Sequence, residues 1–551
     1  MKLYIKYLVV FLMSVLFITN VNLPETQAKV RRAKTTKVAK KKSKKKSKKK
    51  SKKKKSTSKL VSASLSISLD SEPEILSSDT LAPGIIYQRL LCGSGKTRVA
   101  VHFIDFDVSD PLNDIHVVKA GEQIASLRKL QTINHVYDSL NTDRQLLASV
   151  NANFWKAYTN IALGPVISNG EVVEMRRKGR WTSALFDAKN RMYIDRFKIY
   201  GKVRMPSGKY VAIDYVNHRD NAEEVVMYNR YAGDSIPLIT LPAVDTTAVV
   251  LMPDTLEMRD STDIEYDTLQ LKQTQLKQNS IEMVEYYLPK ITLRYLTLPA
   301  VNKKIKCLVT AIDSGCAKTN DARYCVLSLG STYPLSDYPR IGDTLVLKYE
   351  TNSMANVVFT EGVSGTPRLV RNGDPTPEAT FESSTNSRFV NNALPRTAIG
   401  TDSRHSHIYI AVVEPSSNNK LLAGATLADM AKIMRLLGSY NAMNLDGGGS
   451  SSMVIEEENV LYPLIPDAGR RISVALCVIR KELTKYYKSI NKEIINNNPK
   501  YDPINQKMIE EVPVTTVPPE VTPAEVTPAV TPKEVPSTPV PEQKPVEPAK
   551  N

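Results

Sequence analysis

The chain has 551 residues, a hydrophobic fraction of 42% and a formal net charge of +17. This is enough length and apolar content for two or more globular units. The net charge does not describe the folded part. Seventeen Lys and two Arg lie between Lys29 and Lys59, and the rest of the chain is close to neutral. A uniformly basic folded protein is therefore excluded.

The first residues predict a secretory signal peptide over residues 1–28. A basic start, MKLYIKY, precedes the apolar run LVVFLMSVLFI, and Thr26–Ala28 offers small residues for cleavage. The run is shorter than the roughly 20 residues of a membrane span, although an uncleaved anchor stays open as the alternative. We expect no later transmembrane span, and a secreted or cell-envelope location, in the periplasm or at the cell surface.

Residues 29–59 predict a disordered Lys-rich linker, since they contain few apolar side chains to bury. Two interpretations stay open: a solvated spacer, or adhesion to an anionic envelope polymer without specific nucleic-acid recognition. Residues 60–80 and 484–511 are predicted linkers. Residues 512–551 repeat variants of E-V-T-P-A and predict an extended, disordered Pro-rich tail.

The folded part is predicted as a domain in two pieces, residues 81–202 and 351–483, around an inserted β-rich subdomain at residues 203–350. Alternating apolar residues predict strands, and amphipathic patterns predict helices at Leu127–Leu140 and after Thr426. The fold class is therefore α+β, with a mixed β-sheet core and a few packed helices. The predicted strands are Thr97–Phe106, Leu147–Asn151, Arg191–Ile199, Thr344–Tyr349, His407–Val413, Asn441–Leu445, Ser452–Ile455 and Ile472–Ile479.

Gly93–Thr97, GSGKT, superficially matches a phosphate-binding P-loop. That motif needs glycine five positions before its Gly-Lys pair, where this chain has Leu90, and a helix after the Thr, where RVAVHFIDF predicts a strand. We interpret the segment as a turn that enters a strand.

Metal and disulfide signals are weak. His405 and His407 would share a strand face, but no third ligand motif accompanies them, so no metal or other cofactor is predicted. A divalent ion would need carboxylates near Asp446 in space, for which Glu361 or Asp402 are candidates. The five cysteines predict either one local bridge among the three that lie nine residues apart or plain core positions; they are Cys92, Cys307, Cys316, Cys325 and Cys477.

The segment NAMNLDGGGSSSMVI, residues 441–455, stands out. The preceding helix starts with a capping box of Thr426 and Asp429 and ends at Gly438, so Asp446 is predicted to lie at the end of a short strand. Three consecutive glycines cost more conformational entropy than a hairpin requires, which indicates a functional loop.

This segment and its helix resemble the signature of the phosphodiester glycosidase family. Further blocks in the same order, over about Leu81 to Ile479, resemble other segments of that family: VNANFW at Val150–Trp155, GPVISNGEVV at Gly164–Val173, GTPRLVRNGD at Gly365–Asp374, LPRTAIGTD at Leu394–Asp402 and GRRISVALCV at Gly469–Val478. The resemblance implies a hydrolase that cleaves a sugar-1-phosphodiester and releases free sugar and a phosphomonoester. The chain departs from the family at Leu394, Ala152, Asn153 and Trp155, and the resemblance implies a substrate pocket of different shape there.

A phosphate leaves readily, so such a site needs less acid catalysis and more binding of phosphate charge than an ordinary glycosidase. The predicted catalytic residues are Asp446, with Arg396 as a phosphate clamp, and Asn444. Predicted substrate-binding residues are Asn151, Asn153, Gly447, Gly448, Gly449, Ser450, Ser451, Thr397 and Arg471. The expected partner is a phosphorylated glycan; the alternative function is a non-catalytic phosphoglycan-binding envelope protein tethered by its Lys-rich tract.

Overall fold

A computed structural model describes residues 67–69, 71–95, 97–175, 179–237, 261–415, 424–461, 464 and 469–481, with the side chains of 261–270 left out. The predicted signal peptide, the Lys-rich tract and the Pro-rich tail lie outside these residues. No helix of the described part is long and apolar enough to cross a membrane.

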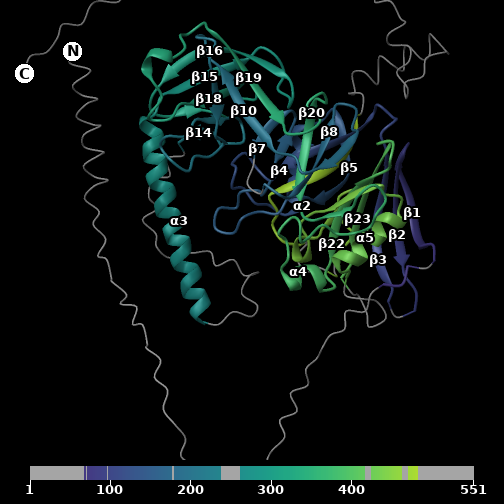
Figure 1. Cartoon of the computed structure of the whole chain (residues 1–551). Coiled ribbons are helices and arrows are strands. Elements are labelled where there is room, and N and C mark those ends of the chain that lie inside the picture. Colours follow the sequence, from purple (N-terminus) through teal and green to yellow (C-terminus); the bar gives the residue numbers. More distant parts are fainter. Residues whose placement is uncertain are drawn as a thin grey trace, which may run out of the picture. The chain divides into compact units, whose positions relative to one another are not determined.

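Strands dominate the described part, in agreement with an α+β class strongly biased toward β (Figure 1). One described sheet is mixed as predicted, because β12 (Tyr215–Val216) pairs parallel with β13 (Val226–Tyr228), while the other described strand pairs are antiparallel. The described helices are α2 (Leu130–Leu140), α3 (Ser261–Tyr287), α4 (Ser387–Asn391) and α5 (Leu427–Leu436), with short 3₁₀ turns η2 (Leu335–Asp337) and η3 (Gly448–Ser450).

Two sheets carry the segments of the candidate site. The seven-stranded sheet runs in the order β1 (Glu74–Ala82), β2 (Ile85–Cys92), β3 (Val99–Asp107), β23 (His407–Val413), β22 (Arg396–Thr401), β24 (Asn441–Asn444), β21 (Arg368–Val370). A five-stranded sheet runs β26 (Glu458–Asn459), β25 (Met453–Ile455), β5 (Arg144–Asn151), β27 (Val474–Lys481), β4 (Asn113–Lys119).

A second five-stranded sheet lies between two cores. Its order is β7 (Glu171–Glu174), β6 (Val166–Ser168), β20 (Phe359–Gly365), β8 (Thr182–Asp187), β9 (Met192–Asp195). One face contributes Val166 and Phe186 to a core shared with the two sheets above, and the other contributes Ile167 and Leu185 to the core of the eight-stranded sheet. The alternation along β6 and β8 therefore joins the layers.

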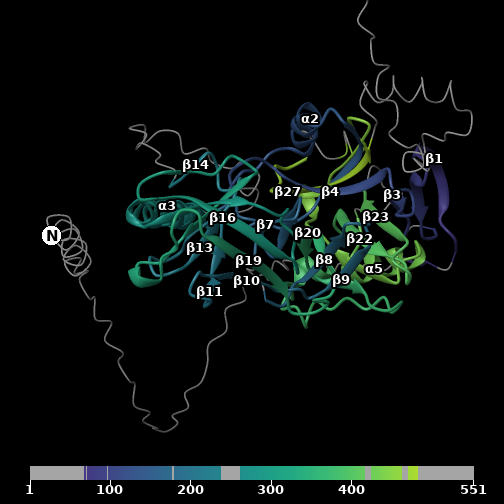
Figure 2. The ribbon, with the colours of Figure 1, turned by 90° about the horizontal axis from the view of Figure 1, so that it is seen from above.

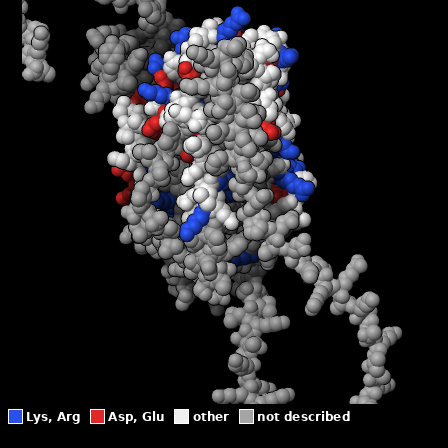
Figure 3. All heavy atoms as spheres, turned by 90° about the vertical axis from the view of Figure 1, so that its left-hand side faces the viewer, with Lys and Arg blue, Asp and Glu red and all other residues white. Residues whose placement is uncertain are grey.

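The eight-stranded sheet takes its strands from residues 199–351. They are, in order, β11 (Tyr210–Ile213), β10 (Ile199–Arg204), β19 (Thr344–Thr351), β16 (Lys304–Asp313), β15 (Lys290–Tyr295), β18 (Tyr324–Ser328), β13 (Val226–Tyr228) and β12 (Tyr215–Val216). Nearby, β14 (Ser235–Ile236) pairs with β17 (Ala317–Lys318). The long helix α3 in this region was not predicted, and Figure 3 shows Lys and Arg interspersed with Asp and Glu on the described surface of that side.

Helices cover the outer faces of the site-bearing sheets. Helix α5 packs on the seven-stranded sheet, while α2 packs over β4, β5 and β27 (Figure 2). The predicted capping box is present: the Thr426 hydroxyl accepts from the Asp429 backbone N–H, and Asp429 accepts from Thr426. Gly438 has φ +102°, a left-handed conformation that suits the end of a helix.

One predicted linker contains ordered structure. Strand β1 begins at Glu74, inside residues 60–80, and Ile67 is buried beneath α5 with its N–H donating to Asp429 Oδ1. The sequence pattern did not reveal this strand because it lies at a sheet edge and most of its residues are exposed.

Candidate active site

The glycine loop that follows β24 is held by three distant segments. The Asp446 N–H donates to Ala152 O at 2.9 Å, and the Gly448 N–H donates to Pro395 O at 2.9 Å. The Arg470 N–H donates to Gly449 O at 3.1 Å. The loop thus closes where strands from both site-bearing sheets end, a place where binding residues concentrate.

Asp446 is a half-buried carboxylate whose Oδ1 accepts from the Gly447 N–H at 2.9 Å. Burial raises the pKa of Asp446 to about 6, against the opposing effects of the Ser450 hydroxyl, the Gly447 N–H and the charge of Arg470. A carboxyl group with a pKa near neutrality can gain or lose a proton under ordinary conditions, as acid–base catalysis requires.

Asn151 supports this loop from below and does not face a ligand. Its Oδ1 accepts from Thr397 Oγ1 at 2.8 Å and from the Ser452 N–H at 3.0 Å, while its Nδ2 donates to Asp446 O at 2.6 Å. Asn151 and Thr397 are fully buried. Their polar atoms join β5 and β22 to the loop, and their contact with substrate stays a prediction.

Asn153 and Asn444 are also committed to the protein. Asn153 donates to Leu163 O at 3.1 Å and accepts from the Ser364 N–H at 3.2 Å. Asn444 Nδ2 donates to Thr366 O and Leu445 O, at 2.8 and 2.6 Å. Both side chains are buried, and Asn444 Oδ1 has no hydrogen-bond partner among the described residues, so their contact with substrate stays a prediction.

Arg396, the predicted phosphate clamp, forms no ion pair with Asp446. Its Nε donates to Ala425 O at 3.0 Å, its Nη2 donates to Phe389 O and Asn392 O at 2.7 and 3.1 Å, and its guanidinium lies 5.3 Å from the Phe389 ring centroid. Burial lowers the pKa of Arg396 to about 10. These contacts make Arg396 a structural cation that fixes the chain on both sides of β22.

The cation beside the loop is Arg470, which sequence reasoning missed. A Cβ on Gly449 would lie 3.6 Å from Arg470 Nη2, whereas the predicted Arg471 is exposed. The missed signal was the position of Arg470 directly after Gly469, in the segment that leads into β27. The sequence pattern does not distinguish two adjacent arginines where no strand alternation has yet begun.

The small residues of the loop divide into two kinds. Gly448 has φ +63° and an added Cβ would meet nothing within 4 Å, so its surroundings are open, while a Cβ on Gly447 would lie 3.2 Å from Pro395 O. Ser450 and Ser451 are buried, and Ser450 contacts the Asp446 carboxyl group. The backbone at Gly448 therefore offers room for a ligand to approach.

A cleft of about 490 Å³ lies beside the loop-supporting residues. Three aromatic side chains line it, those of Phe154, Trp181 and Phe389. The ring centroid of Phe154 lies 5.4 Å from that of Trp181 and 6.0 Å from that of Phe389. Thr366, whose carbonyl accepts from Asn444, also lines it, but Asp446 does not. Aromatic faces with a few polar groups are typical of a small-molecule site.

Glu382, another carboxylate that sequence reasoning missed, lines the same cleft. Its oxygens accept from the Thr182 and Thr366 hydroxyls at 2.6 and 2.9 Å and from the Arg368 N–H at 2.8 Å. Burial raises the pKa of Glu382 above its ordinary value. Because several donors hold it, Glu382 anchors the cleft wall.

The cleft continues into a basic trough of about 500 Å³ that shares Gly179 and Arg180 with it. Arg180, Arg196 and Lys198 line this trough, and the Arg196 guanidinium lies 3.9 Å from the centroid of the Phe381 ring. An aromatic cleft that opens onto three cations suits a ligand with both a sugar ring and negative charge.

The weaker motifs do not form a second site. His405 Nδ1 lies 2.7 Å from Met192 O and His407 Nδ1 lies 2.7 Å from Asp105 Oδ1, so their rings have separate partners. Glu361 accepts from Val117 and Asn169, and Asp402 accepts within its own turn. Among the described residues no group of three or more His, Cys, Asp or Glu is arranged to hold a metal ion.

The predicted turn at Gly93–Thr97 is confirmed for its described residues. The Thr97 N–H and hydroxyl both donate to Ser94 O, and β3 follows. The five cysteines are free thiols, four of them buried and Cys316 exposed, so the predicted local bridge is wrong and Cys307 and Cys325 are core residues.

The glycine loop lies within a stretch of the chain that is similar to known proteins. The model of the phosphodiester glycosidase family matches residues 335–479. This range contains the glycine loop, β22 and β27, but not the VNANFW and GPVISNGEVV blocks. The resemblance to a family of phosphodiester glycosidases, which are hydrolases, is therefore confirmed for the carboxyl-terminal part of the described chain.

The relatives of known activity are animal enzymes. The chain is 31% identical over 134 residues to the N-acetylglucosamine-1-phosphodiester alpha-N-acetylglucosaminidase of Bos taurus and 30% identical to that of Homo sapiens. The match covers 22% of this chain, and it spans only a quarter of the length of each relative.

A solved structure extends the likeness of fold. A hypothetical protein from Synechocystis aligns with 75% of this chain and 64% of its own, with a TM-score of 0.50 and 18% identity. At this identity the likeness concerns the fold alone.

Proposed function

We propose that the protein is an exported hydrolase that cleaves the sugar C1–O bond of a sugar-1-phosphodiester and releases free sugar and a phosphomonoester. The observation that carries the proposal is the carboxyl group of Asp446, which has a pKa of about 6. Its loop is held by Ala152, Pro395 and Arg470 and lies within the region that matches the family model. The animal relatives act on such a bond, which supports the reaction type.

In this proposal the ionised Asp446 takes a proton from the attacking water. The water oxygen bonds to C1 as the C1–O bond breaks, and the electron pair stays with the departing phosphate. Arg470, the cation beside Gly449, stabilises the phosphate charge, and the open backbone at Gly448 admits the group closely.

The substrate class follows from the adjoining clefts. Phe154, Trp181 and Phe389 provide faces for sugar rings, and the trough of Arg180, Arg196 and Lys198 favours a negatively charged remainder. We therefore propose a phosphorylated glycan, such as an envelope phosphoglycan or exopolysaccharide, as the substrate.

The test is the release of N-acetylglucosamine from UDP-N-acetylglucosamine by the purified chain. We expect Asp446→Asn to lower kcat about 10²- to 10⁴-fold, the range of a lost general base. Asp79→Asn, an exposed carboxylate on β1, is the matched control and should be unaffected. Equal turnover in both variants contradicts the assignment, and tight binding without any turnover in the unmodified chain favours the non-catalytic alternative.

A further inference from the structure

A third cleft, here called the β4 cleft, lies along the free edge of β4 and has a volume of about 440 Å³. Side chains of β4, of α2 and of the loop between them line it, and it shares no lining residue with the two clefts described above. The proposed catalytic residues therefore do not account for it.

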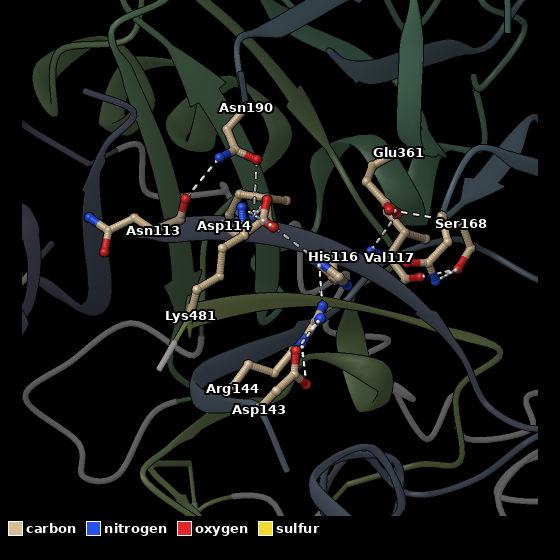
Figure 4. A network of polar contacts seen from close by, with 12 residues as sticks. Asn113, Asp114, His116, Val117, Asp143, Arg144, Ser168, Asn190, Glu361 and Lys481 are labelled. Carbon is tan, nitrogen blue, oxygen red and sulfur yellow. Dashed lines mark hydrogen bonds and ion pairs between the residues drawn. The ribbon is translucent and has the colours of Figure 1, made fainter. Parts of the chain in front are cut away.

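Side chains cap the first part of this edge in place of another strand (Figure 4). The Ile115 N–H donates to Asn190 Oδ1 at 3.2 Å, and the Val117 N–H donates to Glu361 Oε2 at 2.9 Å. Val117 O accepts from Ser168 Oγ at 2.6 Å. These three hydrogen bonds cap the outer edge of β4 as far as Val117. Lys119, two residues further on, lines the β4 cleft.

Lys119 is a buried amine whose charged form has an incomplete set of partners. Only 6% of the residue is exposed, and its Nζ donates to Ser126 O at 2.9 Å. Burial, with the like charge of Arg128 as the second cause, lowers the pKa of Lys119 to about 7. No ion pair is found for Lys119 or for the partly buried Arg128 among the described residues, although a buried charge at a position such as Lys119 is normally paired.

The other charges around the cleft do not balance this pair of cations. Arg230, also in the lining, already pairs with Glu171 at 2.7 Å. Glu122 is the one carboxylate among the described lining residues, and it is exposed. Lys119 and Arg128 therefore lack the negative charge that would complete their site.

We propose that the β4 cleft binds a phosphate group carried by a sugar, with Lys119 and Arg128 as the groups that hold the phosphate. A guanidinium offers two parallel N–H donors to phosphate oxygens, and an ammonium adds a compact charge. Tyr137, Tyr231 and Asn169 line the same cleft and supply hydroxyl and amide groups for a sugar.

The β4 cleft neighbours the glycine loop through one short segment. Ile472 exchanges two backbone hydrogen bonds with Arg128, at 2.8 and 3.1 Å, and Arg470, two residues earlier, lies against Gly449. Lys119 pairs with Val474, and Asn151 pairs with Ala475 on the other side of β27, so the backbones of β4 and β5 lie about 10 Å apart. The identity of the ligand rests on the proposed function: a phosphorylated glycan can present one phosphate to each site.

The test is calorimetric titration of the full-length chain with glucose 6-phosphate, which is a monoester and not a substrate of the proposed reaction. We expect Lys119→Met and Arg128→Gln each to weaken binding at least tenfold, while Lys129→Gln, an exposed neighbour outside the cleft, binds as the unmodified chain does. Inorganic phosphate at equal ionic strength should bind more weakly than glucose 6-phosphate in the unmodified chain. Thermal unfolding of each variant confirms that it is folded.

Equal affinity for glucose 6-phosphate in all four proteins overturns the β4 site, and equal affinity for inorganic phosphate overturns its sugar component. Hydrolysis of UDP-N-acetylglucosamine, measured in parallel, separates this proposal from the proposed function. Binding that depends on Lys119 in a chain without turnover supports the β4 site and contradicts only the hydrolase.

Discussion

The chain contains two short loops rich in glycine and serine, and they differ in what surrounds them. The loop at Gly93–Thr97 is closed mainly by its own residues, since the Thr97 N–H and hydroxyl both donate to Ser94 O, and a distant segment adds a 3.4 Å hydrogen bond from the Ser68 N–H to Thr97 Oγ1. The loop at Asp446–Ser451 is held instead by Ala152, Pro395 and Arg470. Convergence of distant segments on a half-buried carboxylate, and not glycine content, distinguishes a candidate active site from a turn.

Removal of the Arg396 side chain is expected to have the largest effect on stability. Arg396→Ala leaves three carbonyl acceptors without their buried donor, and we expect the free energy of unfolding to fall by about 2–4 kcal/mol. Denaturant unfolding measures this change.

Arg404→Ala is the matched control, because Arg404 is exposed and its described hydrogen bond is made by the backbone N–H. We expect a change within about 0.5 kcal/mol. A stable Arg396→Ala variant that has lost only phosphate affinity would restore Arg396 as the clamp that its sequence position first indicated.

The contacts of Arg396 show what the sequence can and cannot provide. Strand alternation located β23 at His407–Val413 and the capping box located α5, because both signals are local. The direction of a long side chain is not local: Arg396 is bound by carbonyls of residues 389, 392 and 425, which only the tertiary fold brings together. Lys119 was missed for the same reason.

The same limit applies to the asparagines. The sequence correctly indicated that Asn151, Asn153 and Asn444 belong near the glycine loop, but an amide reads equally well as a sugar ligand or as a strand-end cap. Burial decided between these readings. Helix α3 was missed because its described residues are mostly exposed, so no apolar face marks it.

Asn151→Ala tests whether the hydrogen bonds from β5 to the Asp446 loop are what distinguishes this loop from the turn at Gly93–Thr97. The variant loses three buried hydrogen bonds, and we expect about 2 kcal/mol of destabilisation together with reduced turnover. Thr97→Val, which removes a hydroxyl from the self-closed loop, should cost about 0.5–1 kcal/mol and leave turnover unchanged. Comparable losses of activity in the two variants would remove the distinction between the loops.

The pH dependence of turnover tests the electrostatic part of the comparison. If the ionised form of Asp446 is active, kcat/KM falls about tenfold per unit as pH decreases below about 6, and is level above it. An activity that rises on acidification through pH 6 would assign Asp446 as the acid instead.

Stability responds to the same group with the opposite sign. The pKa of Asp446 in the folded chain is above its ordinary value, so the folded state binds more protons between about pH 4 and 6 and the free energy of unfolding decreases as pH rises through that window. Asp446→Asn should remove this contribution, and the difference between the unfolding profiles of the two proteins isolates it from other buried carboxyl groups.

The smallest expected effect comes from one glycine in each loop. Gly95 and Gly448 have φ +57° and +63°, and an added Cβ would meet nothing within 4 Å at either position. Alanine should therefore cost the same backbone strain, about 1–2 kcal/mol, in both loops. The two variants differ only in what the added methyl group obstructs. At Gly448 the methyl group occupies the space through which a phosphate would approach the backbone beside Asp446. At Gly95 the methyl group points into solvent beside a turn.

We expect Gly448→Ala to raise KM for UDP-N-acetylglucosamine several-fold and Gly95→Ala to leave KM unchanged, at matched loss of unfolding free energy. Steady-state kinetics together with denaturant unfolding of the same preparations make the measurement. Because strain is equal in the pair, any difference in KM reports access to the Asp446 loop and not stability. An unchanged KM in Gly448→Ala would show that the ligand reaches Asp446 by another side of the loop.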